Sequence, residues 1–147
     1  MNRVVNQATI DLIKRFEGCR LDAYQDVVGV WTIGYGHTGG FFAESGMTIT
    51  QEQADALLVE DIGKFAEGVG ALVGTISTSD NEFGAMVSLA YNIGLGNFSH
   101  SHVLTYHREG DFTSAAMAFL MWNKAGGRVF PGLVTRRKAE STLYKTP

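Results

Sequence analysis

The sequence predicts an α+β fold that is mainly helical and consists of two lobes. Three observations support this fold class. Apolar residues recur at helical spacing over residues 7–17. A glycine-containing segment of short, strand-like runs follows, to about residue 48. From residue 51 onward, helical patterns with polar capping residues alternate with breaks at glycine.

The chain is expected to form a single domain. Its 147 residues are enough to bury roughly two-thirds of the unfolded surface without disulfides or metals. Within residues 1–147 we expect a β-rich lobe over about 18–48, a linking helix over about 51–67 and a helical lobe over about 75–147. A cleft between two lobes is a common place for a ligand site.

The first lobe should begin with a helix that leads into a hairpin. The helix over residues 7–17 is expected to end at Glu17, because Gly18 follows directly. Residues 23–25 and 30–35 are typical of two short strands. The four residues from Asp26 to Gly29 should form the tight turn between them.

The second lobe is predicted from capping signals. Thr50 with Gln53 and Ser79 with Glu82 have the spacing of capping boxes, so each pair should open a helix. Glycines at positions 68, 70 and 74 are expected to interrupt the chain between these helices. Further helices are expected near 101–108, 111–122 and 133–143.

Composition excludes several function classes. The formal charge of −3 gives no electrostatic reason to expect nucleic-acid binding. Cys19 is the single cysteine, so no disulfide can form within the chain. No apolar run has the length of a membrane span, and no secretory signal pattern opens the sequence. The basic cluster of Arg128, Arg136, Arg137 and Lys138 is expected to be a solvated helix surface.

Two patterns suggest a cofactor or a metal, but each lacks a feature that such a site needs. Glycines at 34, 36 and 39 match a dinucleotide-binding fingerprint, but the residues after them do not open a helix. His100 and His102 lack a third metal ligand at a suitable spacing. We therefore expect no cofactor and no metal.

Three residues near the start of the chain have the chemistry that glycoside hydrolysis needs. Cleavage with inversion uses one protonated carboxyl to protonate the leaving oxygen and one carboxylate to activate water. The helix dipole and apolar neighbours favour the neutral form of Glu17 at the end of its helix. Asp26 lies in a turn, and closing the hairpin brings it near Thr32, so both could hold one water. A tight pair between Glu17 and Arg136 or Arg137 would oppose the acid role by favouring the carboxylate.

The segment from Glu17 to His37 closely resembles the catalytic segment of phage-type lysozymes, the muramidases of glycoside hydrolase family 24. Glu17, Asp26 and Thr32 match its Glu-x8-Asp-x5-Thr pattern, and a GYGH run follows. Two later stretches, residues 91–98 and 122–127, also agree with the family, so the resemblance spans nearly the whole chain.

The resemblance implies a lysozyme-like fold and a role for each of these residues. Glu17 is then the general acid, and Asp26 with Thr32 orients the attacking water. The implied substrate is the MurNAc–GlcNAc backbone of peptidoglycan. The resemblance also places the Tyr91-Asn92 segment in the cleft. The residues expected to bind substrate are Tyr35, Gly36, His37, Tyr91 and Asn92.

The same residues are also consistent with other functions and with another mechanism. A lytic transglycosylase would use Glu17 alone, and a catalytically silent relative would only bind murein. Asp26 could also attack the sugar directly with retention, because carboxyl separation is not readable from sequence. For the muramidase we expect a monomer acting on glycan strands without nucleic acid or a membrane anchor. It would lie in the host cytoplasm before lysis, and a holin would release it to the periplasmic cell wall.

Overall fold

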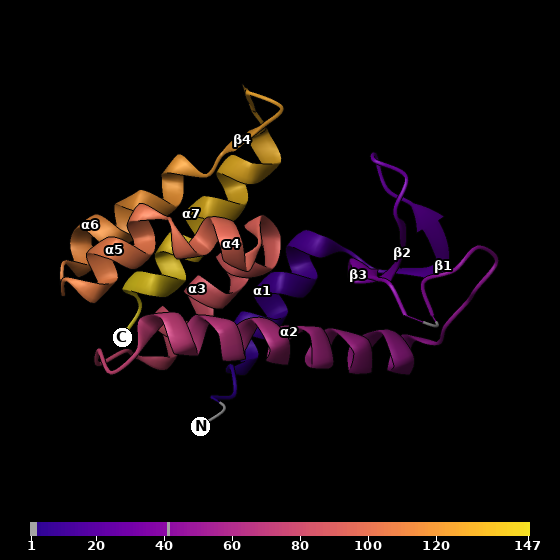
Figure 1. The fold of residues 1–147 in the computed structure, drawn as a ribbon, viewed down its shortest axis with the longest axis horizontal. Helices are drawn as coiled ribbons and strands as arrows, with labels where there is room; N and C mark the ends of the chain where they lie inside the picture. Colours follow the sequence, from indigo (N-terminus) through magenta and orange to yellow (C-terminus); the bar gives the residue numbers. More distant parts are fainter. Residues whose placement is uncertain (1–2, 41) are drawn as a thin grey trace.

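The computed structural model describes residues 3–40 and 42–147. Figure 1 shows a small antiparallel sheet at one end and a larger group of helices at the other, with one long helix running beneath both. The predicted fold class, mainly helical with a small β-rich part, is confirmed. No helix of the described ranges is both long and apolar enough to cross a membrane.

The sheet contains three strands, β1 (Arg20–Gln25), β2 (Trp31–Gly34) and β3 (His37–Thr38), in the order β1-β2-β3. The predicted hairpin turn is present, since the Asp26 amide donates to the Val30 carbonyl at 2.9 Å and the Gly29 amide donates to the Asp26 carbonyl at 3.0 Å. β1 begins three residues before the predicted strand, at Arg20, where it pairs with Gly34. Strands β1 and β3 both run antiparallel to β2.

Helix α1 (Gln7–Glu17) has the predicted bounds. The Asn6 side chain accepts a hydrogen bond from the Thr9 amide at 3.0 Å, which caps the first turn. Gly18 ends the helix with φ of +67°, a conformation that favours glycine. α1 packs against α3 (Asp80–Ile93) and α7 (Pro131–Lys145), so its last turn is held by the helical lobe.

Helix α2 (Gln51–Val73) is the long helix beneath both parts of the molecule (Figure 1). Its predicted capping box is present. The predicted interruption at Gly68 and Gly70 is wrong, because α2 continues six residues beyond the expected end and stops only at Gly74. Packing explains the glycine at 68, since a Cβ there would lie 2.5 Å from Leu95 Cδ1.

The helical lobe surrounds α3. Every residue from Phe83 to Ala90 is buried, and α3 packs against α1, α2 and α7. The remaining helices are α4 (Leu95–Ser99), α5 (His102–Arg108), α6 (Phe112–Ala118) and the short 3-10 turn η1 (Phe119–Met121). The predicted helix over 111–122 is therefore shorter, because its last part tightens into η1.

Two elements of this lobe were not predicted from sequence. α4 is a five-residue helix after Gly94. A two-stranded hairpin of β4 (Lys124–Ala125) and β5 (Arg128–Val129) precedes α7. The hairpin strands are exposed, so no burial pattern marks them in the sequence. α7 begins at Pro131, two residues before the predicted start, with proline in its first turn.

Candidate active site

Glu17 lies where the two parts of the molecule meet. Its side chain is 18% exposed, and its Oε2 accepts a hydrogen bond from Arg136 Nη1 at 2.5 Å. The Gly18 amide closes the last turn of α1 on the Lys14 carbonyl at 3.1 Å, so the backbone beneath Glu17 is ordered by the helix end. Of the two arginines expected near Glu17, Arg136 makes the pair.

Gly36 brings the backbone of the β-rich lobe against the Glu17 carboxyl. A Cβ added at Gly36 would lie 3.0 Å from Glu17 Oε1, closer than an ordinary contact. Gly36 also has φ of +80°, which side chains disfavour. Position 36 therefore requires glycine for both conformation and space.

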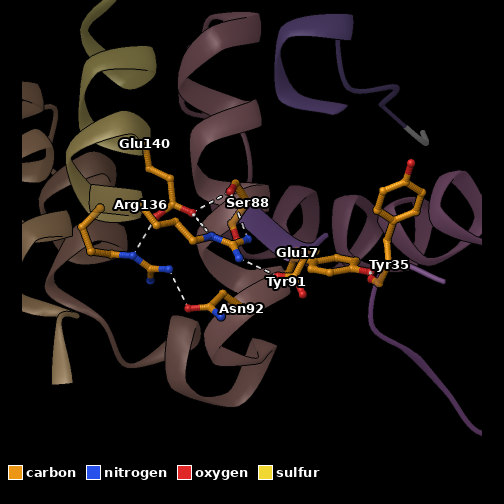
Figure 2. A network of polar contacts seen from close by, with 8 residues as sticks. Glu17, Tyr35, Ser88, Tyr91, Asn92, Arg136 and Glu140 are labelled. Carbon is orange, nitrogen blue, oxygen red and sulfur yellow. Dashed lines mark hydrogen bonds and ion pairs between the residues drawn. The ribbon is translucent and has the colours of Figure 1, made fainter. Parts of the chain in front are cut away.

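The Arg136 guanidinium is fixed on all three nitrogens (Figure 2). Besides the Glu17 contact, Nε donates to Glu140 Oε2 at 3.2 Å and Nη2 donates to the Ser88 carbonyl at 3.2 Å. Only 4% of the Arg136 side chain is exposed. Because the planar fork has a partner in each direction, the position of Nη1 beside Glu17 is strongly defined.

The basic residues 136 and 137 are not a solvated surface, which corrects the sequence prediction. Arg137 is fully buried, and its Nε lies 3.0 Å from Glu140 Oε1. Burial lowers the pKa of Arg137, and the charge of Glu140 opposes that change. Burial likewise raises the pKa of Glu140, against the charges of both arginines. The paired carboxylate explains why two adjacent cations lie inside the protein.

Asp26 and Thr32 are both anchored on Val30. The Asp26 carboxylate accepts from the Val28 and Val30 amides at 2.9 Å each, and the Thr32 hydroxyl donates to the Val30 carbonyl at 3.0 Å. Tyr24, in β1, pairs with Thr32 in β2. The hairpin thus brings Asp26 and Thr32 to neighbouring positions, although their hydrogen bonds are with backbone and not with each other.

Tyr91 joins the helical lobe to the β-rich lobe. Its hydroxyl donates to the Tyr35 carbonyl at 2.6 Å, from the last turn of α3 to the residue after β2 (Figure 2). Burial raises the pKa of Tyr91 far above the usual value, and the negative charges of Glu17 and Asp61 add to the rise. Tyr91 is therefore a neutral hydrogen-bond donor next to Glu17.

Two more of the predicted site residues have polar partners. His37 Nδ1 lies 2.7 Å from Asp61 Oδ2, so an acidic residue of α2 holds this histidine. Asn92 is exposed, and its Oδ1 accepts from Arg137 Nη2 at 2.6 Å. These contacts orient His37 from α2 and Asn92 from α7.

An open cavity of about 410 Å³ lies beside Glu17. Glu17 and Asn92 are the two predicted site residues that line it, together with Arg136. The remaining wall comes from the end of α1, the β4-β5 hairpin and the start of α7: Phe16, Ala125, Phe130, Gly132 and Leu133. Asp26 and Thr32 lie on the hairpin of the β-rich lobe, outside this lining.

Sequence reasoning missed Ser88 and Glu140. Ser88 donates to Glu140 Oε2 at 2.6 Å, which connects α3 to the arginines of α7. A signal was available, because Glu140 follows Arg136 by four residues and Arg137 by three, the spacings of a helical ion pair. Among the described residues, no group of three or more His, Cys, Asp or Glu side chains could hold a metal ion.

Comparison with known proteins gives consistent matches. A family model described as phage lysozyme matches residues 14–140. The endolysin of Bacillus phage B103 is 44% identical over 144 residues, which cover 97% of this chain and 54% of that endolysin. The endolysin of Salmonella phage P22 is 41% identical over 138 residues, which cover 92% of this chain and 93% of that endolysin. The chain thus spans about half the length of the Bacillus phage protein.

A solved structure agrees with these sequence matches. The muramidase domain of SpmX from Asticaccaulis excentricus has 41% sequence identity and a TM-score of 0.90. The match covers 99% of this chain and 100% of that domain.

Proposed function

The chain belongs to the phage lysozyme family, and on that premise we propose that it hydrolyses the β-1,4 bond between MurNAc and GlcNAc in peptidoglycan. The supporting observation is the segment 26–36, which contains two of the groups that hydrolysis needs and ends beside the third. Asp26 opens the segment, Thr32 lies in its strand, and Gly36 at its end leaves no room for a Cβ next to Glu17.

Glu17 is the general acid in this proposal. Its carboxyl lines the open cavity and is within reach of a glycosidic oxygen bound there. It must carry a proton when substrate is bound, so the ion pair with Arg136 has to loosen or be offset at that stage. The cavity is where that proton is given to the leaving sugar.

Asp26 is the general base, and Thr32 positions the attacking water. Two backbone amides donate to the Asp26 carboxylate and hold it in a fixed orientation, as a general base requires. Water activated on the face of the sugar opposite the acid gives inversion at the anomeric carbon.

Five residues are proposed to bind the glycan strand. Gly36 is proposed to contact the sugar through its backbone beside Glu17, because the space of a side chain at this position is taken by the Glu17 carboxyl. Asn92 presents an exposed amide at the cavity. Tyr35 and Tyr91 hold the two lobes at a fixed separation, and His37 is oriented by Asp61.

The biological setting is part of the proposal. We propose that the chain acts as a monomer in bacterial cell lysis, without a cofactor. It is made in the host cytoplasm, passes through a holin pore and then degrades the periplasmic cell wall. Co-expression with and without a holin, followed by culture density, tests this order of events, and lysis without the holin contradicts it.

The reaction is tested by mass spectrometry of fragments released from purified peptidoglycan in ¹⁸O-labelled water. We expect labelled reducing-end MurNAc from the wild type and a loss of about 10³-fold or more with Glu17→Gln. Anhydro products without label would indicate a transglycosylase, and no release by the wild type would indicate a binding module. NMR of the first product formed distinguishes inversion, which gives the α-anomer, from retention.

A further inference from the structure

Glu140 is a buried acidic residue that the proposed reaction does not use. Its side chain is 0% exposed. Oε2 accepts from Ser88 Oγ at 2.6 Å and from Arg136 Nε at 3.2 Å, and Oε1 lies 3.0 Å from Arg137 Nε. Both oxygens face only donors, so Glu140 is present as the carboxylate.

The arrangement is a chain of alternating charges that ends at the candidate acid. It runs from Arg137 to Glu140 and on through Arg136 to Glu17. Figure 2 labels Glu140, Arg136 and Glu17 of this chain. With Glu17 ionised, two positive and two negative groups cancel. With Glu17 protonated, as a general acid must be, the remaining groups carry one net positive charge.

Two uncompensated guanidinium groups would hold Glu17 in its ionised form. Arg136 is in direct contact with Glu17, and the charge of Glu17 also acts on Arg137. A positive charge a few ångströms from a carboxyl favours loss of its proton, more strongly where water is excluded. The carboxylate of Glu140 is placed to offset this effect on both arginines.

We propose that Glu140 is a positioning residue for Glu17, which fixes the Arg136 guanidinium and balances its charge so that Glu17 can keep the proton it donates. This inference rests on the proposed function, in which Glu17 is the general acid. Glu140 itself contacts no substrate and acts through Arg136.

The other ionisable groups around Glu17 have partners of their own. From α3, Tyr91 donates to a backbone carbonyl and stays neutral. From α2 and β3, Asp61 is paired with His37. Within α1, Lys14 is paired with Asp55 and Arg15 lies over the Phe16 ring. Glu140 is therefore the carboxylate that shares Arg136 with Glu17 in the described part of the chain.

The test is the pH profile of peptidoglycan hydrolysis by the purified chain with Glu140→Gln. The variant keeps the side-chain size and removes the charge, so Glu17 should lose its proton at lower pH. We expect the alkaline limb of the profile to move down by about 1 pH unit, with activity at neutral pH about tenfold lower. An unshifted limb in a folded variant overturns the proposal.

The double variant Glu140→Gln with Arg137→Gln separates charge from structure. It restores the net charge of the network and leaves no unpaired partner of the Arg137–Glu140 pair, so it should fold even if the single variant does not. We expect its alkaline limb to return to within about 0.3 pH unit of the wild type. A limb that stays shifted shows that charge balance is not the role of Glu140.

A matched control lies one residue along α7. Ser141 is buried and donates to the Ala116 carbonyl at 2.7 Å, away from Glu17. Ser141→Ala should lower stability and leave the pH limb in place; a shift as large as that of Glu140→Gln overturns the proposal.

Glu17→Gln is measured beside these variants. Normal turnover in Glu17→Gln refutes the acid assignment itself, whereas an inactive Glu17→Gln with an unshifted Glu140→Gln refutes only this inference.

Discussion

Glu17 and Asp26 are held in opposite ways. The Glu17 carboxyl is mostly buried at the end of α1 and contacts a guanidinium that belongs to a buried ionic network. Asp26 lies in an exposed turn, next to the fully exposed Val27, and its carboxylate accepts from two backbone amides. One carboxyl is positioned by distant side chains and the other by its own turn.

This difference predicts how substitutions near each carboxyl group affect stability and activity. The ion pair of Glu17 is made with Arg136 of α7, 119 residues away in the chain, so it depends on the whole fold. The contacts of Asp26 come from residues two and four positions ahead, so they form with the hairpin itself. Substitutions near Glu17 should therefore cost stability and activity together, whereas substitution of Asp26 should affect activity alone.

The largest effect is expected from Arg136→Met. It leaves Glu17 and Glu140 without their shared partner, and breaking a buried pair from one side costs about 3–5 kcal/mol of unfolding free energy. Urea denaturation measures this loss. Arg136→Lys is the control, since it keeps the charge but not the planar fork, and it should lose less. Equal stability of Arg136→Met and the wild type would contradict the comparison.

Asp26→Asn should lower turnover about 100-fold while the fold stays intact. The asparagine oxygen can still accept from the Val28 and Val30 amides, so we expect less than about 1 kcal/mol change in unfolding free energy. Rates of peptidoglycan hydrolysis and urea denaturation are measured together. Asp111→Asn is a matched control, because Asp111 caps α6 through the Ser114 amide at 3.1 Å and should leave turnover unchanged. A severe loss of stability in Asp26→Asn would argue against local anchoring.

Gly36→Ala tests the close approach of the β-rich lobe to Glu17. The positive φ alone costs about 1–2 kcal/mol for a residue with a side chain. Gly39→Ala is the matched control, since Gly39 has φ of +75° and no atom within 4 Å of an added Cβ. We expect Gly36→Ala to lose more stability in urea than Gly39→Ala, because its Cβ also crowds Glu17, and only Gly36→Ala to lose turnover, by about tenfold. Equal turnover in the two variants would mean that the Glu17 contact is unimportant.

The smallest effect concerns His107, a buried titratable group whose printed hydrogen-bond partners within residues 3–40 and 42–147 are two hydroxyl groups. The Thr78 hydroxyl donates to the Ile76 carbonyl and so accepts from His107 Nε2, while the Tyr144 hydroxyl donates to His107 Nδ1. The neutral ring fits this arrangement. Burial lowers the pKa of His107, in contrast to the charged network at Glu17.

Acid should therefore destabilise the chain through His107. The pKa of His107 is lower in the folded chain than in the unfolded chain. The neutral ring therefore contributes its full stability above the unfolded pKa of about 6.5, and this contribution is lost as pH falls below that value. One proton limits the slope to about 1.4 kcal/mol per pH unit. Urea midpoints at pH 7 and pH 5 should differ less in His107→Gln than in the wild type. Exposed His102, changed to Gln, should leave the difference unaltered.

Local signals explain why much of the fold was predictable. α1, the turn at Asp26 and the two capping boxes each depend on residues within four positions of one another, and each was predicted correctly. The sequence also identified Glu17, Asp26 and Thr32 as candidates, through their resemblance to a family pattern. Their roles remain predictions until the variants are measured.

The errors came from contacts between distant segments. Gly68 predicts a break in sequence, but it lies inside α2, where Leu95 packs in the space that a side chain would fill. The sequence predicts that Arg136 and Arg137 are exposed, whereas the burial of these two cations depends on Glu140 and on Ser88 of another helix. Charge pattern alone does not tell a solvated helix face from an internal ion network.

The hydrogen bond from Tyr91 to residue 35 has a consequence for sequence variation within the family. Its acceptor is a backbone carbonyl, which every amino acid supplies, whereas its donor is a phenol. Selection for this bond therefore acts on position 91 and leaves position 35 free to change. The Tyr35 hydroxyl accepts instead from Gln51 Nε2 at 3.1 Å. Among related sequences, position 35 should covary with position 51 and be independent of position 91.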